Sequence, residues 1–204
     1  MTVIKGLYAV SPEAEDSAQL LAKVSQVLDN GVAILQYRNK SDNTVRRLRQ
    51  ASLLASLCKS RHVLFLINDD VTLARAVQAD GVHLGKTDGS VADARAMLGS
   101  DAIIGVSCYD DIHLAEQAVR DGASYVAFGA VYPSHTKPHA VAAPLSLFAQ
   151  AKKLGLPSVA IGGITAENAA AVVEAGADAI AVISGLFGAQ DPAAAARQMA
   201  ALFD

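Results

Sequence analysis

Short apolar runs alternate with longer amphipathic segments along the whole chain. The apolar runs predict buried strands near residues 4–10, 32–37, 63–67, 81–84, 102–106, 124–129, 157–161 and 178–183. The segments between them predict helices near residues 16–29, 43–59, 70–78, 90–98, 111–121, 145–154, 166–175 and 191–203. Strict alternation of strand and helix favours a parallel sheet covered by helices.

One kind of junction recurs, at "LDNGVAILQYR" (28–38), "VQADGVHLG" (77–85), "VRDGASYVAFG" (119–129) and "VEAGADAIAVIS" (173–184). Each stretch ends a helix-like segment, places glycine at the turn and continues into short aliphatic residues. Glycine just past a helix C-terminus adopts the left-handed conformation at low cost. These junctions therefore predict a helix that leads directly into a parallel strand.

Eight strand–helix units in 204 residues predict an α/β protein with a single (β/α)8 TIM barrel domain spanning 1–204. A doubly wound open sheet is the alternative, because a sequence alone does not show closure. The GxGxxG fingerprint of that alternative is missing after the first strand, where "YAVSPEAED" carries no glycine. The longest break, 131–144, contains prolines and histidines and is interpreted as a candidate active-site loop.

Composition narrows the classes of function. The chain is 52% hydrophobic with a formal charge of -3, which suits a well-buried domain and provides no basic field for nucleic acid. Cys58 and Cys108 lack the spacing of a metal site and are read as free thiols in a reducing compartment. Neither a charged leader nor an apolar run of membrane-spanning length is found, so we expect a cytoplasmic chain without membrane contact.

Polar residues collect where the predicted strands end, which is where a barrel gathers its functional groups. In "AILQYRNK" the second strand ends with Gln36, Arg38 and Lys40 at alternate positions, so an extended backbone would direct all three to one side. The later strands end at Asn68 and Asp69, His83 and Asp88, Ser107, Ser134 to Lys137, Gly162 and Gly163, and Ile183 to Gly185. We expect these groups to share one rim.

The cations Arg38, Lys40 and Lys137, together with nearby amides and hydroxyls, suit a polyanion such as a diphosphate. Asp69 and Asp88 would repel that anion unless a hard divalent cation stood between them, so the pattern predicts a Mg2+-diphosphate site.

The backbone N–H groups of Gly162–Gly163 and Ser184–Gly185 follow strands seven and eight, the usual place for a phosphate monoester in a barrel. Two anion sites imply two phosphorylated small-molecule substrates. No Ser-His-Asp or Cys-His order supports a nucleophile, so the polar groups are suited to stabilising departing negative charge.

The motifs "QYRNK", "IND", "DGVHLGKTD", "GVS", "TKPHA", "IGGIT" and "VISG" resemble, in order, those of the thiamine-phosphate synthase (thiamine-phosphate diphosphorylase) family. The resemblance runs from the second strand to the last. It implies a (β/α)8 transferase that condenses 4-amino-2-methyl-5-(diphosphooxymethyl)pyrimidine with 4-methyl-5-(2-phosphooxyethyl)thiazole. The products would be thiamine phosphate and diphosphate, formed by departure of diphosphate and capture of a pyrimidine cation by the thiazole nitrogen.

The resemblance also implies roles for individual residues. The pyrimidine diphosphate would be held by Gln36, Tyr37, Arg38, Asn39, Lys40, Asn68, Ser107 and Lys137. The thiazole phosphate would be held by Ser134, His135, Thr136, Gly163, Ile183 and Ser184. Mg2+ would be bound by Asp69 and Asp88, and the catalytic residues would be Arg38, Lys40, Ser107 and Lys137. Two departures from the family pattern are Ser134, where threonine is more usual, and Cys108–Tyr109 after Ser107.

Other interpretations compete with these roles. Asp69 could cap a helix, but Asp70 can serve that role, so Asp69 is assigned to the metal and Asp70 to the cap. His83 is expected to be a hydrogen-bonded interior histidine rather than an acid–base group. The alternative functions are the related thiazole tautomerase, which lacks the diphosphate machinery, and a non-catalytic barrel that binds phosphorylated ligands. A monomer and a homodimer both remain open.

Overall fold

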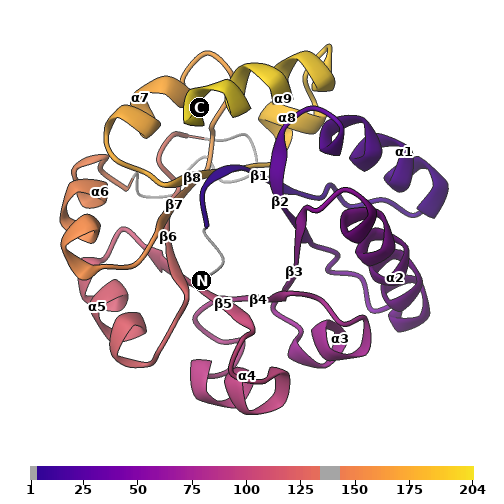
Figure 1. Cartoon of the computed structure of the whole chain (residues 1–204), viewed down its shortest axis with the longest axis horizontal. Coiled ribbons are helices and arrows are strands. Elements are labelled where there is room, and N and C mark those ends of the chain that lie inside the picture. The colour runs from indigo at the N-terminus through magenta and orange to yellow at the C-terminus, as the bar shows by residue number, and fades with distance from the viewer. Residues whose placement is uncertain (1–3, 134–142) are drawn as a thin grey trace.

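Eight parallel strands close into a barrel in the computed structural model, which describes residues 4–133 and 143–204 (Figure 1). The strands are β1 Gly6–Val10, β2 Val32–Tyr37, β3 Leu64–Asn68, β4 Gly81–Leu84, β5 Ile103–Tyr109, β6 Tyr125–Gly129, β7 Ser158–Ile161 and β8 Ala179–Val182. They pair in sequence order, and β8 pairs with β1. The predicted (β/α)8 barrel is confirmed, and closure excludes the open sheet.

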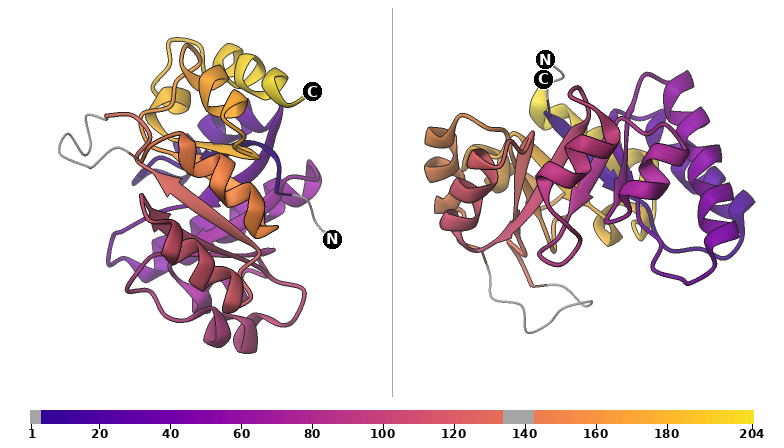
Figure 2. Two further views of the ribbon diagram at one scale, coloured as in Figure 1. Left: turned by 90° about the vertical axis from the view of Figure 1, so that its left-hand side faces the viewer. Right: turned by 90° about the horizontal axis from the view of Figure 1, so that it is seen from below.

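Helices surround the ring of strands on its outside (Figures 1 and 2). They are α1 Ser17–Leu28, α2 Thr44–Ser60, α3 Val71–Ala76, α4 Val91–Leu98, α5 Ile112–Arg120, α6 Ser146–Ala151, α7 Ala169–Glu174, α8 Ser184–Phe187 and α9 Pro192–Ala200, with 3-10 turns η1 Lys152–Leu154 and η2 Ala201–Phe203. Among these, α8 was not predicted. Within the described part of the chain, no helix has the length and apolar character needed to cross a membrane.

Two predicted elements have different ends in the structure. The helix expected from residue 166 begins only at Ala169, because Asn168 Oδ1 accepts the Thr165 N–H at 2.9 Å and holds the preceding residues in a turn. Strand β5 continues past Ser107 to Tyr109, with a change of register between these two residues. Tyr109 takes a positive φ of 53°, which is uncommon for a residue with a side chain.

The apolar residues of the strands form two layers of core. One layer fills the barrel interior and includes Tyr8, Ile34, Leu66, Tyr125 and Val159. A larger layer lies between the strands and the helices, and both cysteines, which are free and buried, belong to it. Because both faces of each strand are covered, the strands carry continuous apolar runs instead of an alternating pattern.

At the amino ends of three strands, a backbone N–H donates a hydrogen bond to the side chain of the residue just before the neighbouring strand. Asp80 Oδ2 accepts the N–H of Phe65 at 2.7 Å. Ser124 Oγ accepts the N–H of Ile104 at 3.0 Å. At the same position of the next junction, Asp178 Oδ2 accepts the Ser158 N–H at 2.8 Å. Ser124 and Asp178 follow the glycine of their junctions, whereas Asp80 directly precedes Gly81. In each case the residue just before the neighbouring strand sets the register at the amino end of the barrel.

Replacing Asp178 tests the contribution of its hydrogen bond with the Ser158 N–H. We expect Asp178→Ala to lower the free energy of unfolding by about 1 kcal/mol, because the buried Ser158 loses an acceptor for its N–H and a partner for its hydroxyl. Asp178→Asn is the matched control, since its amide oxygen can still accept the Ser158 N–H. Urea denaturation of the three proteins measures both effects, and equal losses in the two variants would contradict the proposed role of the acceptor.

Candidate active site

The end of β2 divides its side chains between the two layers of the protein. Gln36 points into the barrel, is only 5% exposed, and donates from Nε2 to the Tyr8 hydroxyl at 2.6 Å. Tyr37 lies in the outer layer, where its hydroxyl donates to Gln50 Oε1 of α2 at 2.8 Å. Asn39 donates to the same oxygen at 3.1 Å. The side chains of Tyr37 and Asn39 therefore brace α2 against β2, whereas Gln36 faces the interior.

The expectation that one extended strand aligns Gln36, Arg38 and Lys40 is wrong, because β2 ends at Tyr37. Arg38 follows the strand, and its N–H donates to Ser11 Oγ at the end of β1, at 3.0 Å. Its guanidinium group contacts Glu13 at 3.0 Å. The ammonium group of Lys40 lies 4.0 Å from Asp69 Oδ2. Both cations still lie at the carboxyl ends of the strands, in the turns after β2.

Two carboxylates from neighbouring strand ends meet at this rim. Asp69 directly follows β3 with a positive φ of 64°, and Asp88 lies in the loop after β4. Asp88 Oδ2 accepts the Gly85 N–H at 2.9 Å. Asp70 forms the helix cap, as expected, since its carboxylate accepts the Leu73 N–H at 2.8 Å. Asp69 is therefore free of the capping role and faces Asp88.

Burial and the proximity of Asp88 both alter the acidity of Asp69. Burial, followed by the hydrogen bond and charge of Asp88, raises the pKa of Asp69 from 3.8 to about 6, while Lys40 and Asn68 oppose the rise. A raised pKa in the folded state means that this group's contribution to stability is fully present below pH 3.8. That contribution is lost as the pH rises through about 6.

The donor set of this pair fits a hard divalent cation. Carboxylate oxygens are the protein ligands that Mg2+ prefers, and Mg2+ commonly uses one or two of them together with substrate phosphates. In residues 4–133 and 143–204, no group of three or more potential metal ligands is found. Asp69 and Asp88 thus resemble a site that a phosphorylated substrate would complete.

A chain of polar side chains crosses the barrel interior beneath the rim. The hydroxyl groups of Tyr8 and Tyr125 lie 2.9 Å apart, and Tyr125 lies 2.9 Å from His83 Nδ1. His83 Nε2 in turn lies 2.9 Å from Ser107 Oγ. The expectation that His83 is a hydrogen-bonded interior residue is confirmed. Tyr8 and Tyr125 were not predicted as part of the site, although a tyrosine within an otherwise aliphatic strand indicates a hydroxyl that needs a buried partner.

The loops after β6, β7 and β8 pack against one another. Gly163 has a φ of 65°, and a Cβ there would lie 2.7 Å from the Tyr132 carbonyl oxygen. A Cβ on Gly185 would clash with the Ile164 carbonyl oxygen. Ser184 begins α8 directly after Ile183, and the first N–H groups of a helix have no acceptor within the helix. Glycine therefore allows these backbones to approach, with N–H groups of Ser184 and Gly185 at the rim.

Four of the predicted residues, Ser134, His135, Thr136 and Lys137, lie outside the described residues. The other predicted site residues lie at the carboxyl ends of the strands or in the loops that follow them. Of these, the structure brings together Lys40, Asn68, Asp69 and Asp88 around the carboxylate pair.

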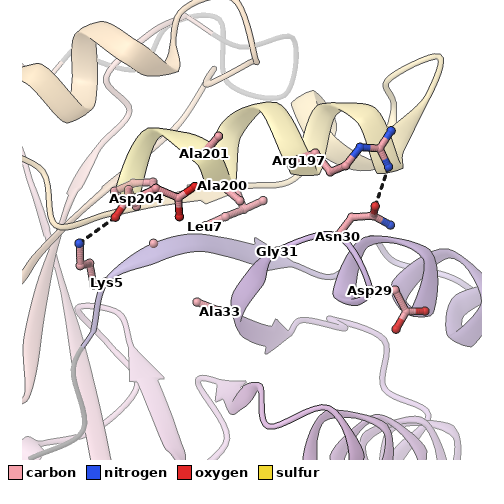
Figure 3. A pocket seen from close by; sticks show the side chains of 12 residues that line it. Lys5, Leu7, Asp29, Asn30, Gly31, Ala33, Arg197, Ala200, Ala201 and Asp204 are labelled. Carbon is pink, nitrogen blue, oxygen red and sulfur yellow. Dashed lines mark hydrogen bonds between the residues drawn. The ribbon is translucent and has the colours of Figure 1, made fainter.

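Two clefts lie at the opposite end of the barrel. One, of about 510 Å³, is lined by residues that include Lys5, Asn30 and Arg197, and Arg197 donates to Asn30 Oδ1 across it at 2.6 Å (Figure 3). The other, of about 780 Å³, lies between α2 and the start of β3 and includes His62 and Asp80. Both are formed at the amino ends of strands, away from the carboxylates and the polar chain.

A closed barrel with its charged and hydrogen-bonding groups gathered at the carboxyl ends of the strands has the arrangement of a (β/α)8 enzyme. The family model described as thiamine monophosphate synthase matches residues 7–186. The chain therefore belongs to the thiamine monophosphate synthase family and is a transferase of thiamine biosynthesis, which confirms the resemblance of its motifs.

Individual relatives agree with this assignment. The thiamine-phosphate synthase of Chromobacterium violaceum is 60% identical over 200 residues, which cover 98% of this chain and 97% of that protein. The thiamine-phosphate synthase of Azoarcus sp. is 58% identical over 201 residues, covering 98% of each. Among solved structures, a thiamine phosphate pyrophosphorylase from Pyrococcus furiosus superposes with a TM-score of 0.85 at 31% identity, covering 97% of this chain and 95% of that one.

The carboxylate pair can be tested without substrates. We expect Asp88→Asn to lower the pKa of Asp69 from about 6 toward its usual value of 3.8, because a neighbouring negative charge is removed. Titration of the Asp69 carboxyl carbon by NMR, in metal-free buffer, measures the shift. Asp93→Asn, on the exposed face of α4, is the control and should leave the Asp69 pKa unchanged. An unaltered Asp69 titration in Asp88→Asn would show that the two carboxylates do not interact.

Proposed function

We propose that this enzyme condenses 4-amino-2-methyl-5-(diphosphooxymethyl)pyrimidine with 4-methyl-5-(2-phosphooxyethyl)thiazole, giving thiamine phosphate and diphosphate. The observation that carries the proposal is the Asp69–Asp88 pair, which adjoins Lys40 and Asn68 at the rim of a family member. Two carboxylates beside a cation match a magnesium-bound diphosphate better than a lone phosphate, because the metal and the cation together would balance the added negative charge.

The pyrimidine diphosphate would lie over the ends of β2, β3 and β5. Gln36 would meet the pyrimidine from the barrel interior, where it is nearly buried and held by Tyr8. Arg38, Lys40 and Lys137 would neutralise the diphosphate as it departs. Asn68 and Ser107 would donate hydrogen bonds to its oxygens. Asn68 and Ser107 are partly buried, which would strengthen their hydrogen bonds relative to those in water.

Mg2+ would be held by Asp69 and Asp88, which fit it in charge and donor type. When bound, it would supply electrostatic stabilisation of the leaving diphosphate. The hydrogen bond and charge of Asp88 contribute to the raised pKa of Asp69, as expected for two carboxylates close enough to share one cation. The carboxylate pair would therefore keep the diphosphate end of the substrate near Lys40.

The thiazole phosphate would lie across the loops after β6, β7 and β8. Gly163 and Ser184 would offer N–H groups to its phosphate, and Ile183 would contact the thiazole. Ser134, His135 and Thr136 would complete this site from the loop after β6. Close packing of Tyr132 on Gly163 supports the proposal, because it brings the β6 and β7 loops together.

The reaction would be dissociative. The bond between the pyrimidine methylene carbon and the diphosphate oxygen would break, and its electron pair would leave with diphosphate. The thiazole nitrogen would then use its lone pair to form the new carbon–nitrogen bond. The thiol of Cys108, one residue after Ser107, is unsuited to covalent catalysis. Burial raises the pKa of Cys108 to about 12, so little of the nucleophilic thiolate forms at neutral pH.

A thiazole tautomerase would need the thiazole-phosphate site alone. The presence of Arg38, Lys40, Asn68 and Asp69 at the opposite part of the rim favours the synthase, because these residues would have no diphosphate to bind in a tautomerase. The curated relatives described above also carry the name thiamine-phosphate synthase.

The deciding experiment is an assay with both substrates and Mg2+. Thiamine phosphate formed in the reaction is oxidised to its fluorescent thiochrome and separated by chromatography. We expect product that requires both substrates and disappears when a chelator is added. Folded protein that forms no product with Mg2+ present would overturn the proposed reaction.

Replacing Asp69 tests the metal site separately. We expect Asp69→Asn to raise the Mg2+ concentration for half-maximal activity by about tenfold or more, since even changes outside the ligand shell commonly cost that much affinity. Asp42→Asn is the control, because Asp42 is exposed in the loop after β2. A Mg2+ titration of initial rates distinguishes the variants, and an unchanged midpoint in Asp69→Asn would remove this residue from the metal site.

A further inference from the structure

Five strands contribute to one continuous chain of hydrogen bonds inside the barrel. It runs from Gln36 of β2 through Tyr8 of β1, Tyr125 of β6 and His83 of β4 to Ser107 of β5. The four donor–acceptor distances lie between 2.6 and 2.9 Å. Tyr8 and Tyr125 are fully buried, so water does not compete for their hydroxyl groups.

The direction of each hydrogen bond in this series follows from its first donor and from the need of each buried hydroxyl proton for an acceptor. The Gln36 amide nitrogen can only donate, so the Tyr8 oxygen accepts there. The Tyr8 hydroxyl then donates its hydrogen bond to the Tyr125 oxygen, its other partner in the described structure. Tyr125, which already accepts from Tyr8, donates to His83 Nδ1. The proton of a neutral His83 is therefore on Nε2, which donates to Ser107 Oγ.

The opposite direction would leave a proton without a partner. If His83 donated from Nδ1, Tyr125 would donate to Tyr8, whose oxygen already accepts from Gln36. The proton of Tyr8 would then lack an acceptor among the residues the structure describes. Burying an unpaired hydroxyl is unfavourable, so the first arrangement is the stable one.

We propose that this series of hydrogen bonds fixes His83 as the Nε2–H tautomer. Ser107 Oγ then accepts a hydrogen bond from His83, so the Ser107 hydroxyl donates its own proton to the diphosphate. This inference rests on the proposed binding of diphosphate by Ser107. His83 and Tyr125 are then positioning residues, since they act through Ser107 and not on the substrate's diphosphate directly. The class of ligand recognised is an anionic oxygen, to which a hydroxyl proton must be donated.

Packing supports a fixed imidazole ring. The ring of His83 stacks on that of Tyr125 with centroids 5.6 Å apart and an interplanar angle of 25°. Gly105, which pairs with His83 in the sheet, provides the space, because a Cβ there would overlap the Tyr125 ring.

NMR of protein labelled with 15N-histidine tests the tautomer directly. The His83 signals are those lost in His83→Asn. We expect Nδ1 to show the shift of an unprotonated nitrogen and Nε2 that of a protonated one at neutral pH. Tyr132→Phe is the control, because it removes a tyrosine hydroxyl that does not belong to this series of hydrogen bonds. It should leave both nitrogen signals of His83 unchanged. A proton on Nδ1, or a charged imidazole, would overturn the inference whether or not the protein forms product.

A double-mutant cycle tests the action through Ser107. We expect Tyr125→Phe to lower kcat by about tenfold with little change in KM, because departing diphosphate loses an oriented donor. Once Ser107→Ala has removed that donor, Tyr125→Phe should reduce kcat by less than twofold further. Fully additive losses would overturn the positioning role. Loss of all product in the wild-type enzyme would instead refute the proposed function, and the NMR result would still decide the tautomer.

Discussion

Closure of eight parallel strands is the constraint on which the rest of the molecule depends. A closed parallel barrel directs every strand end of one kind to the same side, so residues far apart in the sequence meet there without long loops. Asp69 and Asp88 become neighbours because β3 and β4 are adjacent. The amino ends, held by Asp80, Ser124 and Asp178, contribute register and stability. The amino ends of the strands thus contribute to stability, and the carboxyl ends carry the candidate functional groups.

The narrow interior imposes a second requirement. Polar atoms inside a closed barrel cannot reach water and must satisfy one another. Gln36, Tyr8, Tyr125, His83 and Ser107 do so in a single path, which joins the buried core to the rim. Folding therefore orients a group at the proposed active site before any substrate binds, which avoids reorganisation during the reaction.

The strands and most helices could be predicted because glycine junctions and apolar runs are local signals. Helix α8 could not, since four residues give no readable period. The rim position of Asp69 and Asp88 followed from strand order alone. The bounds of β2 and the rim position of Arg38 and Lys40 were predicted. Their alignment with Gln36 was not found, because both cations lie beyond the last strand residue, Tyr37. The contact between Tyr8 and Tyr125 depends on the stagger of strands across the barrel, which no local pattern encodes.

Asp69 also bears on how this protein would respond to selection. Its left-handed backbone conformation and its apposition to Asp88 both oppose folding, and asparagine would relieve the charge while tolerating the conformation. A library screened only for heat resistance should therefore accumulate asparagine at position 69. A library screened for vitamin-independent growth of the host should retain aspartate under the proposed metal role. Under the proposed metal role, the residue would mark a place where activity is favoured over robustness.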